Sequence, residues 1–336
     1  SLNRPDGNVT LVAKAHDAMA DEYDVINDLW YSYLLNRIHD FILRHIPKCA
    51  PDERCLALDI GCGTGIQSIL LSMCGFHVRG IDISKELLKK ANAKSNIELI
   101  NNSSCLYQTP FPSFQDEQKA QILIASQKRA DKIIPLPVFE FANAEESETY
   151  IEQKNSLKLA VCTGSVLSFL TDPNAFLENI SRILAPDGIL IIEFEQKYNF
   201  DLFWPLFDSL FGGIIGFEQP FRITLQNIFS STKKRLKVDY PFELSDGSEI
   251  ILPLSLYHNR EVLSLAEKNN LIPIEIQSIH SITNLIPSPI LHKQNPSFLL
   301  RTTFTILAYF EDILRAFWPF KSFGCSSIIA FQKGLK

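Results

Sequence analysis

The chain has 336 residues, of which 46% are hydrophobic and 21% are charged, so it can bury a sizeable core and is neither a disordered nor a collagen-like protein. Its formal net charge of −6 provides no broad basic face for a phosphate backbone, and we expect no nucleic-acid partner. No apolar run is long and uninterrupted enough for a transmembrane segment and no signal peptide is recognisable, so the sequence predicts a cytoplasmic protein.

The cysteines are seven in number, and no Cys-x-x-Cys pair occurs among them. Because thiolate ligands of a structural metal usually come in such close pairs, we expect no metal site. We expect free thiols, as is usual in a reducing cytoplasm, at all of these positions: Cys49, Cys55, Cys62, Cys74, Cys105, Cys162 and Cys325.

The N-terminal third alternates between helical and strand patterns. Apolar residues at helical spacing predict helices within 13–46, and Pro47 ends the run. The elements expected next are a strand at Cys55–Ile60, a helix at Thr64–Met73, a strand at His77–Ile83 and a helix capped by Ser84. This order predicts a parallel sheet with crossover helices. Polar clusters and several prolines then make 97–137 a partly ordered insertion.

The alternation resumes after residue 137. The expected elements are strands at Val138–Asn143, Leu157–Cys162 and Gly188–Phe194, a helix that begins at Asp172-Pro173, a hairpin of Leu236–Leu244 and Glu249–Leu254, a helix at Arg260–Asn269, a strand at Leu271–Ile279, a helix at Phe298–Phe317 and a strand at Ser326–Phe331. Between Phe200 and Phe221 lie six of the 24 Phe residues and one Trp. This stretch forms either the core of a cap or the wall of an apolar substrate pocket. Basic residues are absent between Tyr198 and Phe221, which argues against a helix on a membrane surface.

The segment Leu58–Gly65 reads LDIGCGTG and joins a predicted strand to a predicted helix. Its glycines let the backbone pass close to a bound group, and the helix N-terminus offers free N–H donors. A dinucleotide fingerprint needs a third glycine where this chain has Ile66. Asp59 suits a positively charged ligand better than a pyrophosphate, and Asp82 follows the next strand, where it can accept ribose hydroxyls. The sequence therefore predicts a nucleoside ligand with an amino-acid or sulfonium portion.

Three motifs in this order resemble those of the class I S-adenosylmethionine-dependent methyltransferases: LDIGCGTG, GIDIS at 80–84, and LAPDG at 184–188 running into Ile189–Phe194. The resemblance implies an α/β fold with a doubly wound, seven-stranded, mostly parallel, Rossmann-like sheet. We expect an N-terminal helical lid over 1–50 and a methyltransferase domain over 51–336. Insertions are expected near 97–137, 197–260 (a cap) and 281–322.

The resemblance also implies S-adenosyl-L-methionine as the cofactor, S-adenosyl-L-homocysteine as its product, and no metal. In the family pattern Asp59 lies near the ammonium group, Asp82 holds the ribose hydroxyls and Asn143 stands near the adenine amino group. Thr163 and Gly164 would border the methyl group. The full set of implied cofactor-binding residues is Tyr23, Asp59, Gly61, Cys62, Gly63, Gly65, Asp82, Ile83, Asn143, Ala144, Thr163 and Gly164.

The function implied is methyl transfer by in-line displacement to a small, apolar or aromatic metabolite. The segment 20–29 resembles the start of the quinone-ring C-methyltransferases, although the insertions depart from that group. No catalytic residue is assigned; candidates for a general base are Glu195, Tyr198, His258 and His280. Two alternatives remain open, a non-catalytic S-adenosylmethionine-binding partner subunit and a nicotinamide-dependent oxidoreductase. The oligomeric state is not predicted.

Overall fold

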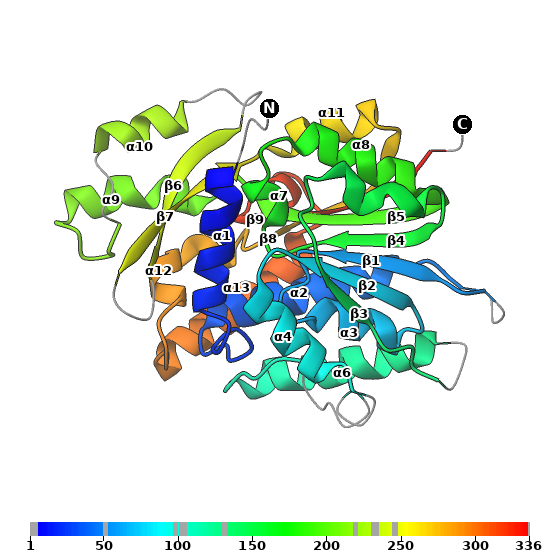
Figure 1. Cartoon of the computed structure of the whole chain (residues 1–336). Coiled ribbons are helices and arrows are strands. Elements are labelled where there is room, and N and C mark those ends of the chain that lie inside the picture. Colours follow the sequence, from blue (N-terminus) through cyan, green and yellow to red (C-terminus); the bar gives the residue numbers. More distant parts are fainter. Residues whose placement is uncertain are drawn as a thin grey trace.

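The computed structural model describes residues 6–49, 53–96, 100, 106–129, 133–217, 221–229, 235–243 and 248–334. A seven-stranded sheet runs through the molecule in the order β3-β2-β1-β4-β5-β9-β8 (Figure 1). Its strands are β1 (Leu56–Ile60), β2 (His77–Asp82), β3 (Val138–Phe141), β4 (Leu157–Cys162), β5 (Leu184–Glu195), β8 (Leu271–Ile279) and β9 (Ser326–Lys333). Only the pairs made by β9 are antiparallel. The expected doubly wound, mostly parallel α/β sheet is confirmed.

Helices cover both faces of this sheet (Figure 1). One face carries α2 (Leu29–His45), α3 (Ile66–Met73), α4 (Lys85–Lys94) and α6 (Pro112–Lys128), and the other carries α8 (Pro173–Ile183) and α11 (Asn259–Lys268). In β4, Leu159 and Val161 pack into the core under α2 and α3, whereas Ala160 and Cys162 pack into the core under α8. Since the central strands are buried on both faces, they read as continuous apolar runs in the sequence.

The remaining elements surround the carboxyl ends of the strands. They are α1 (Asp6–Ala18), α7 (Val166–Phe169), α9 (Trp204–Leu210), α10 (Phe221–Ile228), the hairpin β6 (Leu236–Glu243) and β7 (Glu249–Leu256), α12 (Ser288–Leu291) and α13 (Phe298–Leu314). Short 3-10 turns lie at Ser147–Gln153, Phe200–Leu202, Thr283–Leu285 and Phe320–Ser322. Within the described ranges, no helix is both long and apolar enough to span a bilayer.

Local sequence signals set several boundaries where they were predicted. Ser84 caps α4 by accepting a hydrogen bond from the N–H of Leu87, and Asp172 caps α8 by accepting from the N–H groups of Asn174 and Ala175. The strands β4 and β8 have the predicted bounds. The predicted hairpin is present as β6 and β7, and its turn at 244–247 lies outside the described residues.

The insertion at 97–137 contains more regular structure than expected. Its 17-residue helix α6 buries Phe114, Gln118, Gln121 and Ala125 at helical spacing against α2 and α3. Gln118 accepts hydrogen bonds from the backbone N–H groups of Leu106 and Tyr107, at 2.9 and 3.2 Å. Because two of the four buried residues are polar, hydrophobic periodicity could not reveal this helix.

The Phe-rich stretch does not form the core of a cap. Phe207, Phe211 and Phe221 each expose half or more of their surface, and Trp204 is held by a hydrogen bond from its indole N–H to the carbonyl of Asn284. The expectation of a cap core is therefore wrong for these residues. Composition could not show whether this aromatic segment is buried or exposed, because both kinds of segment contain the same residue types.

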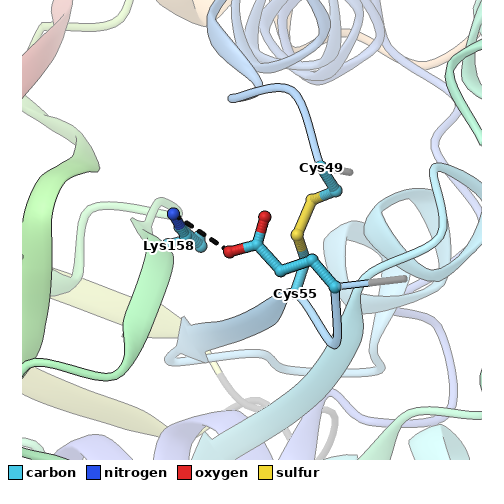
Figure 2. Close-up of a disulfide and its surroundings, with 4 residues drawn as sticks. Cys49, Cys55 and Lys158 are labelled. Carbon is cyan, nitrogen blue, oxygen red and sulfur yellow. Dashed lines mark ion pairs between the residues drawn. A yellow bond between two sulfur atoms is a disulfide. The ribbon is translucent and has the colours of Figure 1, made fainter. Parts of the chain in front are cut away.

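A disulfide links Cys49, just after α2, to Cys55, just before β1, with the Cα atoms 6.0 Å apart (Figure 2). Beside it, Glu53 forms an ion pair with Lys158 at 3.0 Å (Figure 2). The prediction of free thiols is wrong for this pair, since no spacing pattern in the sequence marks it. Cys62, Cys74, Cys162 and Cys325 are free and buried. Cys105 lies outside the described residues.

Replacing Cys49 with serine is expected to lower the free energy of unfolding by about 2 kcal/mol, because the bridge closes a short loop in the unfolded chain. Urea titrations of the wild type and of Cys49→Ser, each with and without reductant, measure this difference. Reductant should lower the free energy of unfolding of the wild type to that of the variant, and it should leave the value of the variant unchanged. A wild type that is insensitive to reductant would contradict the bridge.

Candidate cofactor site

The glycine loop between β1 and α3 is shaped by left-handed backbone conformations. Gly61 has φ +68°, and a Cβ there would lie 2.2 Å from Cγ2 of Val166. Gly63 has φ +54° and faces the ring of Tyr23, from which a Cβ would lie 3.4 Å away. The N–H groups of Gly61 and Cys62 both donate to the carbonyl of Ile81, which fastens the loop to β2. Side chains at the two glycines would be strained, so the loop requires glycine there.

A pocket of about 740 Å³, its open mouth included, adjoins this loop. Eight of the predicted residues line it: Tyr23, Gly61, Gly63, Asp82, Ile83, Asn143, Ala144 and Gly164. The pocket lies at the carboxyl ends of β1, β2 and β4, where doubly wound sheets bind their ligands.

Four predicted residues lie outside the pocket lining. Asp59 is buried behind the loop and accepts a 2.5 Å hydrogen bond from the hydroxyl of Ser68. The Cys62 side chain is buried, with its sulfur directed to Gly80. Gly65 is the N-cap of α3. Thr163 is buried next to Gly164. These four residues therefore lie behind the pocket wall rather than on it.

The sequence missed part of the wall. Val9, Val12 and His16 of α1 line the pocket, together with Ile81, Leu87, Glu145, Val166, Phe169 and Leu170. The α1 residues are spaced three and four apart, which is a helical stripe that the sequence contains. The expected lid over 1–50 includes this helix, but the helical pattern was assigned only from residue 13 onward.

Two acidic side chains give the site its electrostatic character. Asp82 accepts hydrogen bonds from the N–H groups of Gly63 and Ser84, both at 2.8 Å. Burial raises the pKa of Asp82, and burial raises the pKa of Asp59 to about 7. Neither carboxyl group forms an ion pair within the described part of the chain. His16 of the pocket wall partly offsets the effect of burial on the pKa of Asp82. A site with two buried acids that form no ion pair favours a positively charged ligand.

Tyr23 is held over the loop by its neighbour in sequence. Asp24 accepts a 2.5 Å hydrogen bond from the hydroxyl of Thr64 and forms a 2.6 Å ion pair with Lys94. These contacts join the segment after α1 to α3 and α4. Burial raises the pKa of Tyr23, so its hydroxyl stays protonated and can donate a hydrogen bond.

Beyond Gly164 lies a pair of glutamates at the end of β5. Glu193 is fully buried and accepts hydrogen bonds from the N–H of Ser165, at 2.7 Å, and from the hydroxyl of Ser326. Glu195 is bonded through Oε1 to the hydroxyl of Ser165 at 2.7 Å. Its Oε2 has no hydrogen-bond partner among the described residues. Burial, followed by the nearby charge of Glu193, raises the pKa of Glu195 to about 8.

Two tyrosines stand near Glu195. Tyr31 and Tyr240 keep 44% and 41% of their surface accessible, yet burial raises the pKa of each. The charge of Glu195 raises both values further. The three side chains are therefore close enough together for their charges to interact.

The other base candidates have structural roles. His280 is fully buried, stacks on Trp30 with ring centroids 3.9 Å apart, and is hydrogen-bonded to Thr283 at 2.8 Å. His258 is the N-cap of α11. The Tyr198 ring packs edge-on against His258. Asn143, expected near adenine, lines the pocket and also accepts a hydrogen bond from the N–H of Glu145 at 3.0 Å.

The family model described as "Methyltransferase domain" matches residues 30–231, more than half of the chain. The chain belongs to this methyltransferase family. The resemblance to the class I S-adenosylmethionine-dependent methyltransferases is thereby confirmed, and the Rossmann-like sheet agrees with it.

Individual members of the methyltransferase family are only distantly similar. The curated "Putative methyltransferase GWCH70_2453" of Geobacillus sp. (strain WCH70) is 30% identical over 76 residues, which are 21% of this chain and 31% of that protein. The match thus spans less than a third of that relative's length.

Two solved structures cover nearly the whole chain. The [4+2]-cyclase SpnF has a TM-score of 0.53 at 12% identity, over 99% of both chains. Geranyl diphosphate C-methyltransferase from Streptomyces coelicolor A3(2) has a TM-score of 0.49 at 13% identity, over 99% of this chain and 100% of that one. At such identities the likeness concerns the fold alone.

Proposed function

We propose that the pocket binds S-adenosyl-L-methionine and that the protein transfers its methyl group to a small, apolar or aromatic acceptor. The observation that carries this proposal is the glycine loop beside two buried acids, Asp59 and Asp82, that form no ion pair among the described residues. Bound S-adenosylmethionine supplies an electrophilic methyl group on a sulfonium ion.

Each wall of the pocket has a part in binding. The carboxylate of Asp82 has lone pairs left, beyond its two backbone bonds, for the ribose hydroxyls. Ile83 and Leu87 offer an apolar wall for adenine, and Asn143 stands at the rim. The protonated Tyr23 covers the loop and helps to exclude water. Asp59 acts through its charge from behind the loop.

We place the acceptor beside Tyr31, Tyr240 and Glu195, and we name this group of three side chains the acceptor recess. Ser165 supports this placement, because it holds Glu195 and directly follows the pocket residue Gly164. Two aromatic rings and one carboxyl group suit a flat acceptor that gives up a proton. Bound S-adenosylmethionine would supply the methyl group, and Glu195 would take up the proton that the acceptor gives up.

The proposal is tested by calorimetry with S-adenosyl-L-homocysteine and by methyl transfer from radiolabelled S-adenosylmethionine to an extract of small metabolites. Saturable binding with label transfer supports both parts. Binding without transfer would overturn the enzymatic part and favour the non-catalytic partner subunit. Absence of binding would overturn both parts, and saturable binding of NADH instead would favour the oxidoreductase.

The affinity for S-adenosylmethionine is expected to rise about tenfold between pH 6 and pH 8. The cause is Asp59, whose pKa of about 7 leaves it mostly protonated at pH 6, and a cationic ligand favours its charged form. Calorimetry at several pH values measures the change. Asp59→Asn keeps the shape of the side chain and should bind with an affinity that no longer varies with pH. An equally steep dependence in that variant would exclude Asp59 as the cause.

A further inference from the structure

Helix α13 is apolar on two opposite faces. Its inner face packs into the core through Leu300, Phe304 and Ala308. On the same side, the buried Glu311 accepts hydrogen bonds from the N–H groups of Ile282 and Thr283, at 2.8 and 2.9 Å. The apolar contacts that anchor α13 to the core are therefore made by this inner face, and an ion pair between Asp312 and Arg37 of α2 adds to them.

The outer face carries large apolar side chains that remain exposed. We name this set the α13 stripe, and its members keep between 47% and 80% of their surface accessible: Phe298, Leu299, Ile306, Tyr309, Phe310, Ile313, Phe317 and Trp318. The six members on the helix recur at intervals of three, four and seven and so share one face, and Phe317 and Trp318 follow just after the helix ends. A band of this size on a protein surface marks an interaction site.

The unpaired charges at the two ends of the α13 stripe are positive. The side chains of Arg301 near one end and Lys321 beyond the other are exposed and have no partner among the described residues. Of the acidic residues on the helix, Glu311 is buried, and Asp312 pairs with Arg315 at 3.3 Å and with Arg37 at 3.1 Å, an arginine that it shares with Asp40 and Glu117. Free positive charge thus brackets the stripe in a chain whose net charge is −6.

We propose that the α13 stripe docks the protein onto a membrane surface rich in anionic phospholipid. Aromatic side chains such as Tyr309, Phe310 and Trp318 prefer the boundary between headgroups and acyl chains, and basic residues beside them bind anionic headgroups. The helix would lie in the plane of the surface with its inner face still packed on the protein.

The same charges argue against a second copy of the chain as the occupant. In a twofold dimer with antiparallel α13 helices, Arg301 of one copy comes close to the Lys321 end of the other. In a parallel dimer, Arg301 faces Arg301 and Lys321 faces Lys321. Both arrangements bring like charges together, with no free acidic side chain on the stripe to compensate.

The sequence argument against a membrane-surface helix concerned 198–221, where basic residues are absent. The α13 stripe is a different segment, and its exposure became evident only when the inner face was seen to be occupied. This docking surface is independent of the cofactor pocket, so either proposal can fail without the other.

The test is co-sedimentation of the protein with vesicles of phosphatidylcholine, with and without about 30 mol% phosphatidylserine. The wild type is expected to bind the phosphatidylserine vesicles. The double variant Leu299→Glu/Phe310→Glu should lose at least tenfold in binding, and Arg301→Glu/Lys321→Glu should lose the preference for phosphatidylserine. Leu123→Glu/Ile124→Glu on α6 replaces two exposed apolar residues elsewhere and should bind like the wild type.

Thermal melting and S-adenosylhomocysteine binding verify that each variant is folded. Three outcomes would overturn the proposal: no binding of the wild type to phosphatidylserine vesicles, equal binding by Leu299→Glu/Phe310→Glu, and equal loss in the α6 control. Sedimentation velocity gives a fourth. A wild-type dimer that the Leu299→Glu/Phe310→Glu variant converts to a monomer would identify a second copy as the occupant.

Discussion

Asp82→Ala is expected to reduce the affinity for S-adenosyl-L-homocysteine by at least about 100-fold, while the protein stays folded. In the free protein the Asp82 carboxylate fixes the glycine loop through the N–H of Gly63 and the start of α4 through the N–H of Ser84. We propose that the same group accepts the ribose hydroxyls. The variant therefore loses a contact with the ligand and a support of the loop together. Calorimetry measures their combined effect on the affinity.

The two contributions are separated by a ligand analogue. The wild type should bind the 2′,3′-dideoxy form of S-adenosylhomocysteine much more weakly than the parent compound. Asp82→Ala should bind both compounds with similar weakness, because the group that tells them apart is gone. If the variant still discriminates between them as the wild type does, the ribose hydroxyls are held elsewhere.

Asp172→Ala is the matched control for the loss of a carboxylate that accepts two backbone hydrogen bonds. Asp172 caps α8 through the N–H groups of Asn174 and Ala175, and it does not line the pocket. This variant should lose about 1 kcal/mol of stability and retain its affinity for the ligand. Equally weakened binding in the control would mean that a general loss of stability, rather than a contact at Asp82, lowers the affinity.

The parts of the fold that follow from local physics were predictable from the sequence. The strands β4 and β8 needed only apolar runs, and the caps Ser84 and Asp172 needed only a polar oxygen before a helix. The glycine loop was predictable because close backbone approach restricts the choice of residue. Seven of the eight predicted residues that line the pocket do so for a similar reason: they lie at or near strand ends that the parallel sheet brings together, whereas Tyr23 lies between α1 and α2.

What the sequence could not provide depends on contacts between distant segments. The buried Gln118 and Gln121 of α6 are stable only because backbone groups outside the helix bond to them, so α6 gave no apolar signal. Asp59 reads as a pocket residue but is drawn behind the loop by Ser68. The Cys49–Cys55 pairing and the exposure of the α13 stripe likewise follow from tertiary packing.

The acceptor recess shows the same dependence on distant segments most strongly. Tyr31 comes from α2, Glu195 from the end of β5 and Tyr240 from the hairpin β6–β7. The hydrophobic periodicity of each element does not distinguish these residues from their neighbours. Only Glu195 was a candidate from sequence, because it ends a strand at the edge where the methyl group is expected.

Glu195→Gln is expected to lower the rate of methyl transfer about 100-fold at pH 9, where the wild-type side chain is charged. With a pKa of about 8, Glu195 holds its proton at neutral pH and becomes a base only as the pH rises. The wild-type rate should therefore increase through pH 8. The variant should show no such step, since glutamine cannot accept the proton. Tyr198→Phe, another base candidate, should keep the step.

A readout without substrate tests the same carboxyl group. Because burial raises the folded-state pKa of Glu195 above its ordinary value near 4.5, Glu195 contributes stability that is complete below about pH 4.5 and is lost as the pH rises through about 8. Relative to the wild type, Glu195→Gln should become progressively more stable between pH 5 and pH 9 in urea titrations. A constant difference would show that Glu195 is charged throughout, and the acceptor's proton would then need another destination.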